Sequence, residues 1–200
     1  MKHIISVVFF IACGTPSFAQ FSKGDKALSG SLSLKIEQDP VSSNVSSTRE
    51  TTVGFYPSFG VFVNKNLEIG ALFGYSSSSA ESEYSRSAQS GSHGFVAGLY
   101  GSKYFQITEK FFFSFLGKAE HHSTKRFSKD PDQDGQTFSR DVKVNFSPHL
   151  VFFPASNWAL TANLGGAGYS YHVSNNYSSH VFSIDIGRNF GFGFSYYFRK

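Results

Sequence analysis

Cysteine is nearly absent from the sequence, because Cys13 is the only one among 200 residues. A single thiol cannot build a disulfide framework within one chain. Charged residues are also scarce at 16%, and the formal net charge of +4 includes no dense basic cluster, which argues against a nucleic-acid partner. Beyond the N-terminal segment, no apolar run reaches the roughly 20 residues that a membrane-spanning helix needs. These absences argue against a disulfide scaffold, a nucleic-acid-binding protein and a helical membrane protein.

Aromatic residues, in contrast, are abundant. They make up 18% of the chain, with 24 phenylalanines and 10 tyrosines, yet the mean hydropathy is only −0.20. A transmembrane β-barrel produces this combination, because apolar residues alternate with polar ones along each strand and the average hydropathy stays low. The composition therefore favours a membrane barrel.

The last segment of the chain, residues 189–198, shows the alternation most clearly. In a strand its aromatic residues share one face, while glycine, serine and Tyr197 occupy the other. A soluble protein would need a second layer to cover such an aromatic face, whereas lipid needs none. The pattern predicts a transmembrane strand whose lipid-facing residues are Phe190, Phe192, Phe194, Tyr196 and Phe198.

The N-terminal segment has the features of a secretory signal peptide. Lys2 precedes an apolar run over residues 4–12, and Ser17-Phe18-Ala19 is a small-x-small cleavage site. Cleavage after Ala19 gives a signal peptide at 1–19, a short periplasmic segment at 20–26 and a barrel at 27–200, with no cysteine left in the mature chain. A lipoprotein signal cut before Cys13 is the alternative.

Eight segments are predicted as strands, and the connections between them alternate in length. Short turns are expected at 64–66, 106–109 and 154–157, and longer polar loops at 38–49, 77–91, 123–137 and 173–178. This alternation predicts an all-β fold, an eight-stranded antiparallel up-and-down transmembrane β-barrel, with both termini periplasmic and the long loops extracellular. A soluble β-sandwich would not require short and long connections to alternate. The predicted strands are 27–37, 50–63, 67–76, 92–105, 111–122, 138–153, 158–172 and 179–198. Most have one clearly apolar face, but the inside and outside of 92–105 are ambiguous because both of its faces carry apolar residues.

Several short motifs resemble the small outer-membrane β-barrel domain family of Gram-negative bacteria. They include Lys23-Gly24-Asp25, Tyr56-Pro57-Ser58-Phe59, and the terminal run from Gly193 to Phe198. Lys103 stands where the family usually has arginine. The resemblance implies a location in the outer membrane, with membrane lipid, lipopolysaccharide and the barrel-insertion machinery as partners. Most members of this family have no assigned reaction, so the resemblance indicates location and architecture more firmly than activity.

The interior of the predicted barrel is expected to be polar and filled by its own side chains. An eight-stranded barrel is just wide enough for its side chains to fill, so opposite charges are expected to pair there. A narrow ion or proton path is the alternative. The side chains predicted to point inward are Lys35, Glu37, Glu68, Lys118, Glu120, His122, Asp141, Lys143, His149 and Asp185.

An acidic motif in the third long loop fits the spacing of a calcium loop. Asp130, Asp132 and Asp134 precede Gly135, and Asp141 occupies the twelfth position. Pro131 and the aspartate at position 12 depart from the pattern, and Asp-Pro and Asp-Gly are also common in turns. We therefore assign no metal ligand and no cofactor, and calcium remains an open alternative.

A histidine–serine element suggests one further activity. His172-Val173-Ser174-Asn175 resembles the H-x-S-N element of outer-membrane lipid A deacylases, in which histidine activates serine at a membrane-facing site. His121-His122-Ser123 is a weaker second copy, and Asp185 is the nearest acid in sequence. With no convincing third member, we predict no catalytic residue. The expected function is that of a non-enzymatic outer-membrane barrel with a structural or surface-interaction role. Its residues do not identify an extracellular partner. A lipid-modifying hydrolase and a calcium-dependent adhesin are the alternatives.

Overall fold

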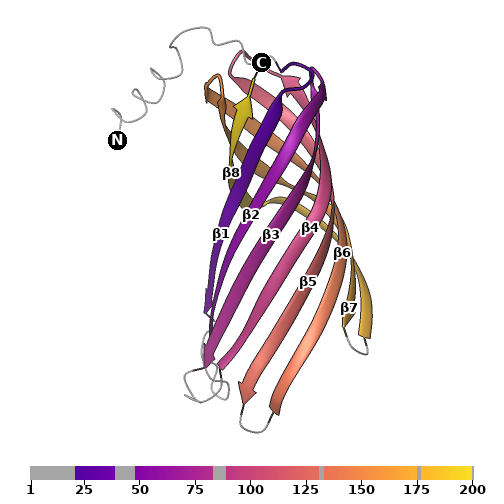
Figure 1. The fold of residues 1–200 in the computed structure, drawn as a ribbon. Helices are drawn as coiled ribbons and strands as arrows, with labels where there is room; N and C mark the ends of the chain where they lie inside the picture. The colour runs from indigo at the N-terminus through magenta and orange to yellow at the C-terminus, as the bar shows by residue number, and fades with distance from the viewer. Residues whose placement is uncertain (1–20, 39–47, 83–88, 131–132, 175–176, 200) are drawn as a thin grey trace, which may run out of the picture.

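Eight antiparallel strands form a closed barrel in the computed structural model, which describes residues 21–38, 48–82, 89–130, 133–174 and 177–199. Each strand pairs with its neighbours in the sequence, and β1 pairs with β8 (Figure 1). No helix in the described part of the chain is long and apolar enough to cross a membrane. The strands are β1 (Lys26–Gln38), β2 (Thr48–Asn64), β3 (Leu67–Ser82), β4 (Gln89–Gln106), β5 (Phe111–Asp130), β6 (Gln133–Ala155), β7 (Trp158–Ser174) and β8 (Tyr177–Phe198).

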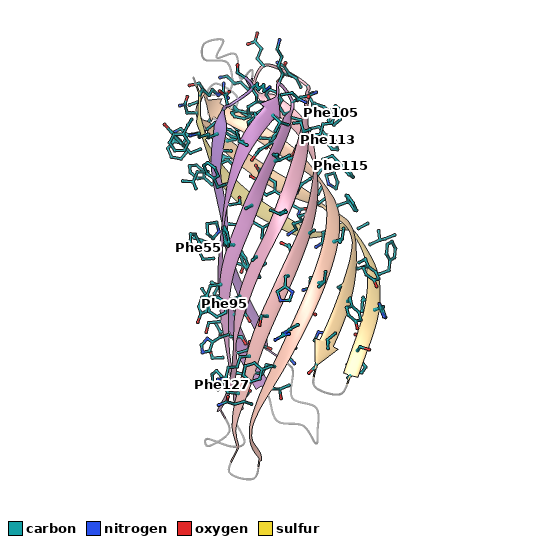
Figure 2. All side chains as sticks on the ribbon, turned by 45° about the vertical axis from the view of Figure 1, so that its right-hand side comes forward. Phe55, Phe95, Phe105, Phe113, Phe115 and Phe127 are labelled. Atoms are coloured by element: carbon teal, nitrogen blue, oxygen red, sulfur yellow. The ribbon has the colours of Figure 1, made fainter. Side chains whose placement is uncertain are left out.

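The barrel has the inside and outside that the alternation predicted. On β8, Phe192 is 79% exposed on the outer face, whereas Tyr197 is 1% exposed inside the barrel. Apolar side chains cover the outside along its length, from Phe105 near the upper end to Phe127 near the lower end (Figure 2). A water-soluble barrel would bury such residues, so this exterior fits lipid. The predicted fold class is confirmed.

Strand β4, whose faces the sequence left ambiguous, turns its even-numbered residues inward. Val96, Tyr100 and Tyr104 point into the barrel, and Phe95 and Leu99 point out. Both faces of β4 carry aromatic rings, because the two tyrosines point inward and their hydroxyl groups donate hydrogen bonds to a polar side chain in the lumen. The alternation was therefore real but was obscured by aromatic residues on the inner face.

The strands are longer than predicted, which corrects the expected loop lengths. β5 continues to Asp130 and β6 begins at Gln133, so most of the loop expected at 123–137 is a paired hairpin. The loop expected at 173–178 is likewise mostly strand. An antiparallel ladder satisfies its backbone hydrogen bonds outside the membrane as well as inside it. Beyond the membrane, polar side chains are also tolerated on both faces of a strand.

A cluster of buried side chains closes the barrel at the end where the three short turns lie. The Phe21 ring stacks on Phe62, with ring centroids 4.1 Å apart, and also contacts Tyr104, Phe153 and Tyr197. We call this group the aromatic cluster; its members come from the segment before β1 and from every strand except β3. It places the main apolar core at one end of the barrel, and its members are Phe21, Ala27, Phe62, Tyr104, Phe112, Val151, Phe153, Ala159 and Tyr197.

The seam between the first and last strands is short. β1 pairs with β2 along its whole length, but in the described part of the chain it pairs with β8 only through residues 26–30, opposite 194–198. Farther along, the register of β8 against β7 shifts between Asn163 and Gly165, and Gly165 has a φ of 107°. Closure of the barrel therefore depends on the final residues of the chain.

Candidate functional site

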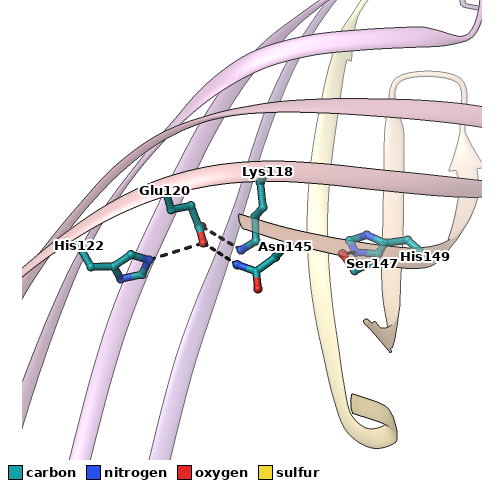
Figure 3. Close-up of polar contacts among 6 residues, drawn as sticks. All are labelled: Lys118, Glu120, His122, Asn145, Ser147 and His149. Atoms are coloured by element: carbon teal, nitrogen blue, oxygen red, sulfur yellow. Dashed lines mark hydrogen bonds and ion pairs between the residues drawn. The ribbon is translucent and has the colours of Figure 1, made fainter. Parts of the chain in front are cut away.

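A cluster of polar side chains lies inside the barrel on β5 and β6. Lys118, Glu120 and His122 all occupy even positions of β5, so strand alternation directs them into the lumen together. The Lys118 ammonium donates to Oε1 of Glu120 at 2.9 Å, and Asn145 donates to Oε2 at 3.3 Å (Figure 3). Nε2 of His122 lies 3.5 Å from the same Oε2. One carboxylate thus accepts two hydrogen bonds and has a histidine ring beside it.

A cavity of about 490 Å³ lies between this cluster and the closed end of the barrel. Its walls include Glu68, Tyr100 and Lys118, together with Ser147 and His149, whose side chains are hydrogen-bonded at 2.9 Å. Residues of β1 and β8 beside the seam also line it. The lumen is therefore closed at the short-turn end and holds open space next to that closure, rather than being filled throughout as expected.

The residues predicted to point inward do so wherever their side chains are described. Glu68 and Glu120 are buried, and Lys118, His122, Asp141, Lys143 and His149 are half-buried on inner faces. The side chains of Lys35, Glu37 and Asp185 lie outside the described residues. The structure therefore shows the predicted pairing of opposite charges at Lys118 and Glu120.

An aspartate–histidine pair that the sequence did not reveal lies nearer the other end of the barrel. Asp141 on β6 is paired in register with His172 on β7, and the Asp141 Oδ1 to His172 Nδ1 distance is 2.6 Å. Sequence reasoning considered only Asp185 as the acid, because the register between two strands cannot be read from either one alone. The pair gives His172 an acidic partner inside the lumen.

The pair bears on the hydrolase hypothesis. His172 and Ser174 lie on the same inner face of β7, so they face the lumen rather than the membrane, and in the described structure no hydrogen bond joins them. In the second element His121 faces outward and His122 inward, because consecutive strand residues alternate. Activation of serine by histidine needs a hydrogen bond between the two. In the described structure, His172 and Ser174 therefore do not form a nucleophile–base pair.

The pair also involves the last member of the calcium motif. Asp132 and the side chains of Asp130 and Asp134 lie outside the described residues, and Asp141 is bonded to His172. Among the described residues, no three histidine, cysteine, aspartate or glutamate side chains lie close enough together to hold a metal ion.

A closed barrel with an apolar exterior and a polar interior defines a class of protein, the transmembrane β-barrel. Residues 37–150, more than half of the chain, match the family model described as the autotransporter beta-domain. The chain belongs to this family and is an outer-membrane β-barrel protein of the Gram-negative type. The family resemblance predicted from the sequence is confirmed at this level.

Solved structures with a similar fold are remote in sequence. The N-terminal β-barrel domain of Pseudomonas aeruginosa OprF is 11% identical with a TM-score of 0.46, covering 88% of this chain and 98% of that one. Ail of Yersinia pestis is 16% identical with a TM-score of 0.46, covering 88% and 99%. The translocator domain of the autotransporter NalP from Neisseria meningitidis is 9% identical with a TM-score of 0.47, covering 92% and 61%. No curated protein matches the chain.

Proposed function

We propose that this chain is a non-enzymatic integral barrel of the outer membrane with a structural or surface-interaction role. The observation that carries the proposal is the continuous apolar exterior, on which Leu32, Phe73 and Phe192 are all more than 60% exposed. In this arrangement the short turns and both termini face the periplasm, and the polar hairpins stand outside the cell. Membrane lipid surrounds the wall, and the insertion machinery recognises the closing strand β8.

The aromatic cluster supports a barrel that does not conduct. Phe21, Phe62 and Phe153 fill the short-turn end at ring-centroid distances of 4.1 to 5.7 Å. A path for ions or for an extended polypeptide would have to displace these rings. The same packing argues against passage through this lumen, although the matched family model is named the autotransporter beta-domain. In planar bilayers we expect negligible conductance, and large, stable single-channel steps would contradict a closed lumen.

The orientation can be tested by cysteine labelling, because Cys13 is the only native cysteine. Gln136→Cys places a thiol on the exposed hairpin of β6, and Lys65→Cys places one in a short turn. With a membrane-impermeant maleimide on intact cells, Gln136→Cys is expected to react, and Lys65→Cys only after the outer membrane is permeabilised. The wild type gives the background from Cys13. The reverse pattern would overturn the orientation, and labelling of neither variant in the membrane fraction would overturn the location.

The hydrolase alternative rests on His172 and Ser174 and has its own test. Lipid A from cells that express the protein is expected to keep all its acyl chains. Loss of an acyl chain that requires both His172 and Ser174, as shown by His172→Ala and Ser174→Ala, would replace the proposed function with a lipid-modifying one.

The calcium alternative concerns the hairpin between β5 and β6. We expect protease cleavage of this hairpin on intact cells to be the same with calcium and with chelator. Protection by calcium that Asp132→Ala/Asp134→Ala abolishes would instead establish a calcium-dependent surface module.

A further inference from the structure

The inner wall of the barrel carries short hydroxyl side chains at the level of the cavity. Every strand except β3 contributes a serine or a threonine to the cavity wall, among them Ser58 of β2, Ser102 of β4 and Thr161 of β7. The lumen of an eight-stranded barrel is just wide enough for its side chains to fill, so a layer of short side chains leaves part of it open. The cavity therefore follows from the sequence at this level of the wall.

Two tyrosine rings lie flat against the wall of the cavity. A Cβ built at Gly74 of β3 would collide with the Tyr56 ring, and one built at Gly70 would collide with the Tyr100 ring. Only the missing side chain at each glycine lets a ring approach the backbone of the neighbouring strand so closely. Both tyrosines also line the cavity, so the face of each ring that is turned away from its glycine borders the open space.

The charged groups around the cavity already have partners. The Lys118 ammonium lies 2.9 Å from the Glu120 carboxylate. The Glu68 carboxylate accepts hydrogen bonds from Tyr100 and Tyr104. A charged ligand would have to break one of these contacts or stay without a counter-charge, and an unpaired charge inside the barrel is costly. The cavity is therefore suited to a ligand without net charge.

The wall also offers hydroxyl groups to a ligand. The Ser147 hydroxyl is bonded to His149 (Figure 3), whereas in the described part of the chain the hydroxyls of Ser114 and Thr161 have no side-chain partner. A hydroxyl group both donates and accepts hydrogen bonds. A wall with several of them complements a molecule that itself carries several hydroxyl groups.

The two sides of the cavity differ in how tightly they are packed. On the short-turn side, Phe153 of the aromatic cluster is 2% exposed. On the other side, the side chains of Lys118 and His122 are 32% and 22% exposed, so that side is not sealed. The lumen therefore has the form of a cup, with a closed floor and a more open mouth.

We propose that this cavity binds a neutral polyhydroxylated solute of the size of a mono- or disaccharide. The C–H groups of such a molecule pack on the faces of the Tyr56 and Tyr100 rings, and its hydroxyl groups pair with those of the wall. The cavity volume of about 490 Å³ lies within the range of small-molecule sites, roughly 300–1,000 Å³. Because the floor is closed, the site holds its ligand rather than passing it through. The inference goes beyond the proposed function and does not depend on which way the barrel faces.

The test is a ligand-observed NMR titration of the full-length protein in a phosphocholine detergent, since a detergent with a sugar headgroup would compete. The probes are glucose and maltose, with glucosamine and glucuronate as charged analogues of glucose. The variant is Gly193→Phe, which places a ring in the cavity; a Cβ there would meet only Thr161 Cβ, at 3.7 Å. The matched control is Gly101→Phe, which adds the same ring to the outer wall, where a Cβ would meet only a backbone oxygen at 3.8 Å.

We expect the wild type and Gly101→Phe to bind maltose within twofold of each other, and Gly193→Phe to bind it at least tenfold more weakly. Glucosamine and glucuronate should each bind the wild type at least fivefold more weakly than glucose, because their charge finds no free partner. Tyr56→Leu, which removes one ring without touching the Glu68 contacts, should lose at least threefold and serves if Gly193→Phe does not fold.

Three results would overturn the inference. The first is that neither glucose nor maltose shows saturable binding, which would mean that the cavity holds water only. The second is unchanged maltose binding in Gly193→Phe or in Tyr56→Leu, and the third is binding of either charged analogue as tight as that of glucose. None of these results affects the labelling of Gln136→Cys on intact cells, so failure of the sugar site and failure of the proposed function give different readouts.

Discussion

The Tyr104 hydroxyl donates a 2.6 Å hydrogen bond to Oε2 of Glu68 inside the closed end of the barrel, where both side chains are buried. Tyr100 donates to Oε1 of the same carboxylate at 2.5 Å. Both tyrosines come from β4 and Glu68 from β3, so the contact joins neighbouring strands through the lumen. A buried carboxylate without such donors would strongly destabilise the fold.

Removing one of these donors should therefore lower stability. Tyr104→Phe leaves Oε2 of Glu68 without a described donor, and we expect a loss of about 1–3 kcal/mol in the free energy of unfolding. The measurement is the urea midpoint in phospholipid vesicles. Tyr196→Phe on the outer wall, with no described hydroxyl hydrogen bond, is the control. Equal midpoints for the two variants would show that the tyrosine–carboxylate contact is not stabilising.

The aromatic cluster predicts that the N-terminal segment stabilises the barrel. Phe21 is 3% exposed and contacts five other rings, so Phe21→Ala should destabilise by about 3–5 kcal/mol, as large core truncations do. Phe59→Ala, at a half-exposed ring on the outer face, should lose clearly less. A Phe21→Ala protein as stable as Phe59→Ala would mean that the segment does not hold the end closed.

Much of this fold was predictable because residues that face lipid have to be apolar, and this requirement produces a visible alternation along each strand. Phe192 and Phe194 alternate with Gly193 and Ser195, and the structure keeps that alternation. The inner and outer faces of β4 were not predictable in this way, because Tyr100 and Tyr104 face inward and donate hydrogen bonds to a carboxylate on another strand.

The Asp141–His172 contact also escaped prediction. It depends on the register of β6 against β7, which shifts at two places, between Phe146 and His149 and between Phe152 and Ala155. Alternation within a strand identifies a face but not the residue opposite. The long hairpins were missed for a related reason, because outside the membrane neither face of a strand has to be apolar.

Glycine at position 60 is predicted to be required by close packing. A Cβ there would collide with the Glu68 carboxylate and the Tyr100 hydroxyl, whereas one at Gly101 would meet nothing closer than 3.8 Å. Gly60→Ala should therefore lower the urea midpoint and Gly101→Ala should not. A tolerated Gly60→Ala would indicate that Glu68 and Tyr100 can move apart without loss of stability.

The two faces of β8 should respond differently to a carboxylate. Phe192→Asp places charge against lipid, which destabilises by up to about 2–4 kcal/mol near the bilayer centre, and assembly should fall. Gly193→Asp points into the cavity, where a Cβ would lie 3.7 Å from Thr161 Cβ, and should be tolerated. Outer-membrane yield of the two variants is the readout. Equal yields would mean that the faces are not assigned correctly.

The central claim is that the exposed apolar wall faces a bilayer. Refolding the urea-denatured protein, residues 20–200, into phospholipid vesicles tests it most directly, with circular dichroism and an unheated gel as readouts. We predict a β-sheet spectrum that forms only with vesicles, and a folded band that migrates differently from the heated one. A helical spectrum, or a folded protein that stays in solution without lipid, would contradict the membrane barrel.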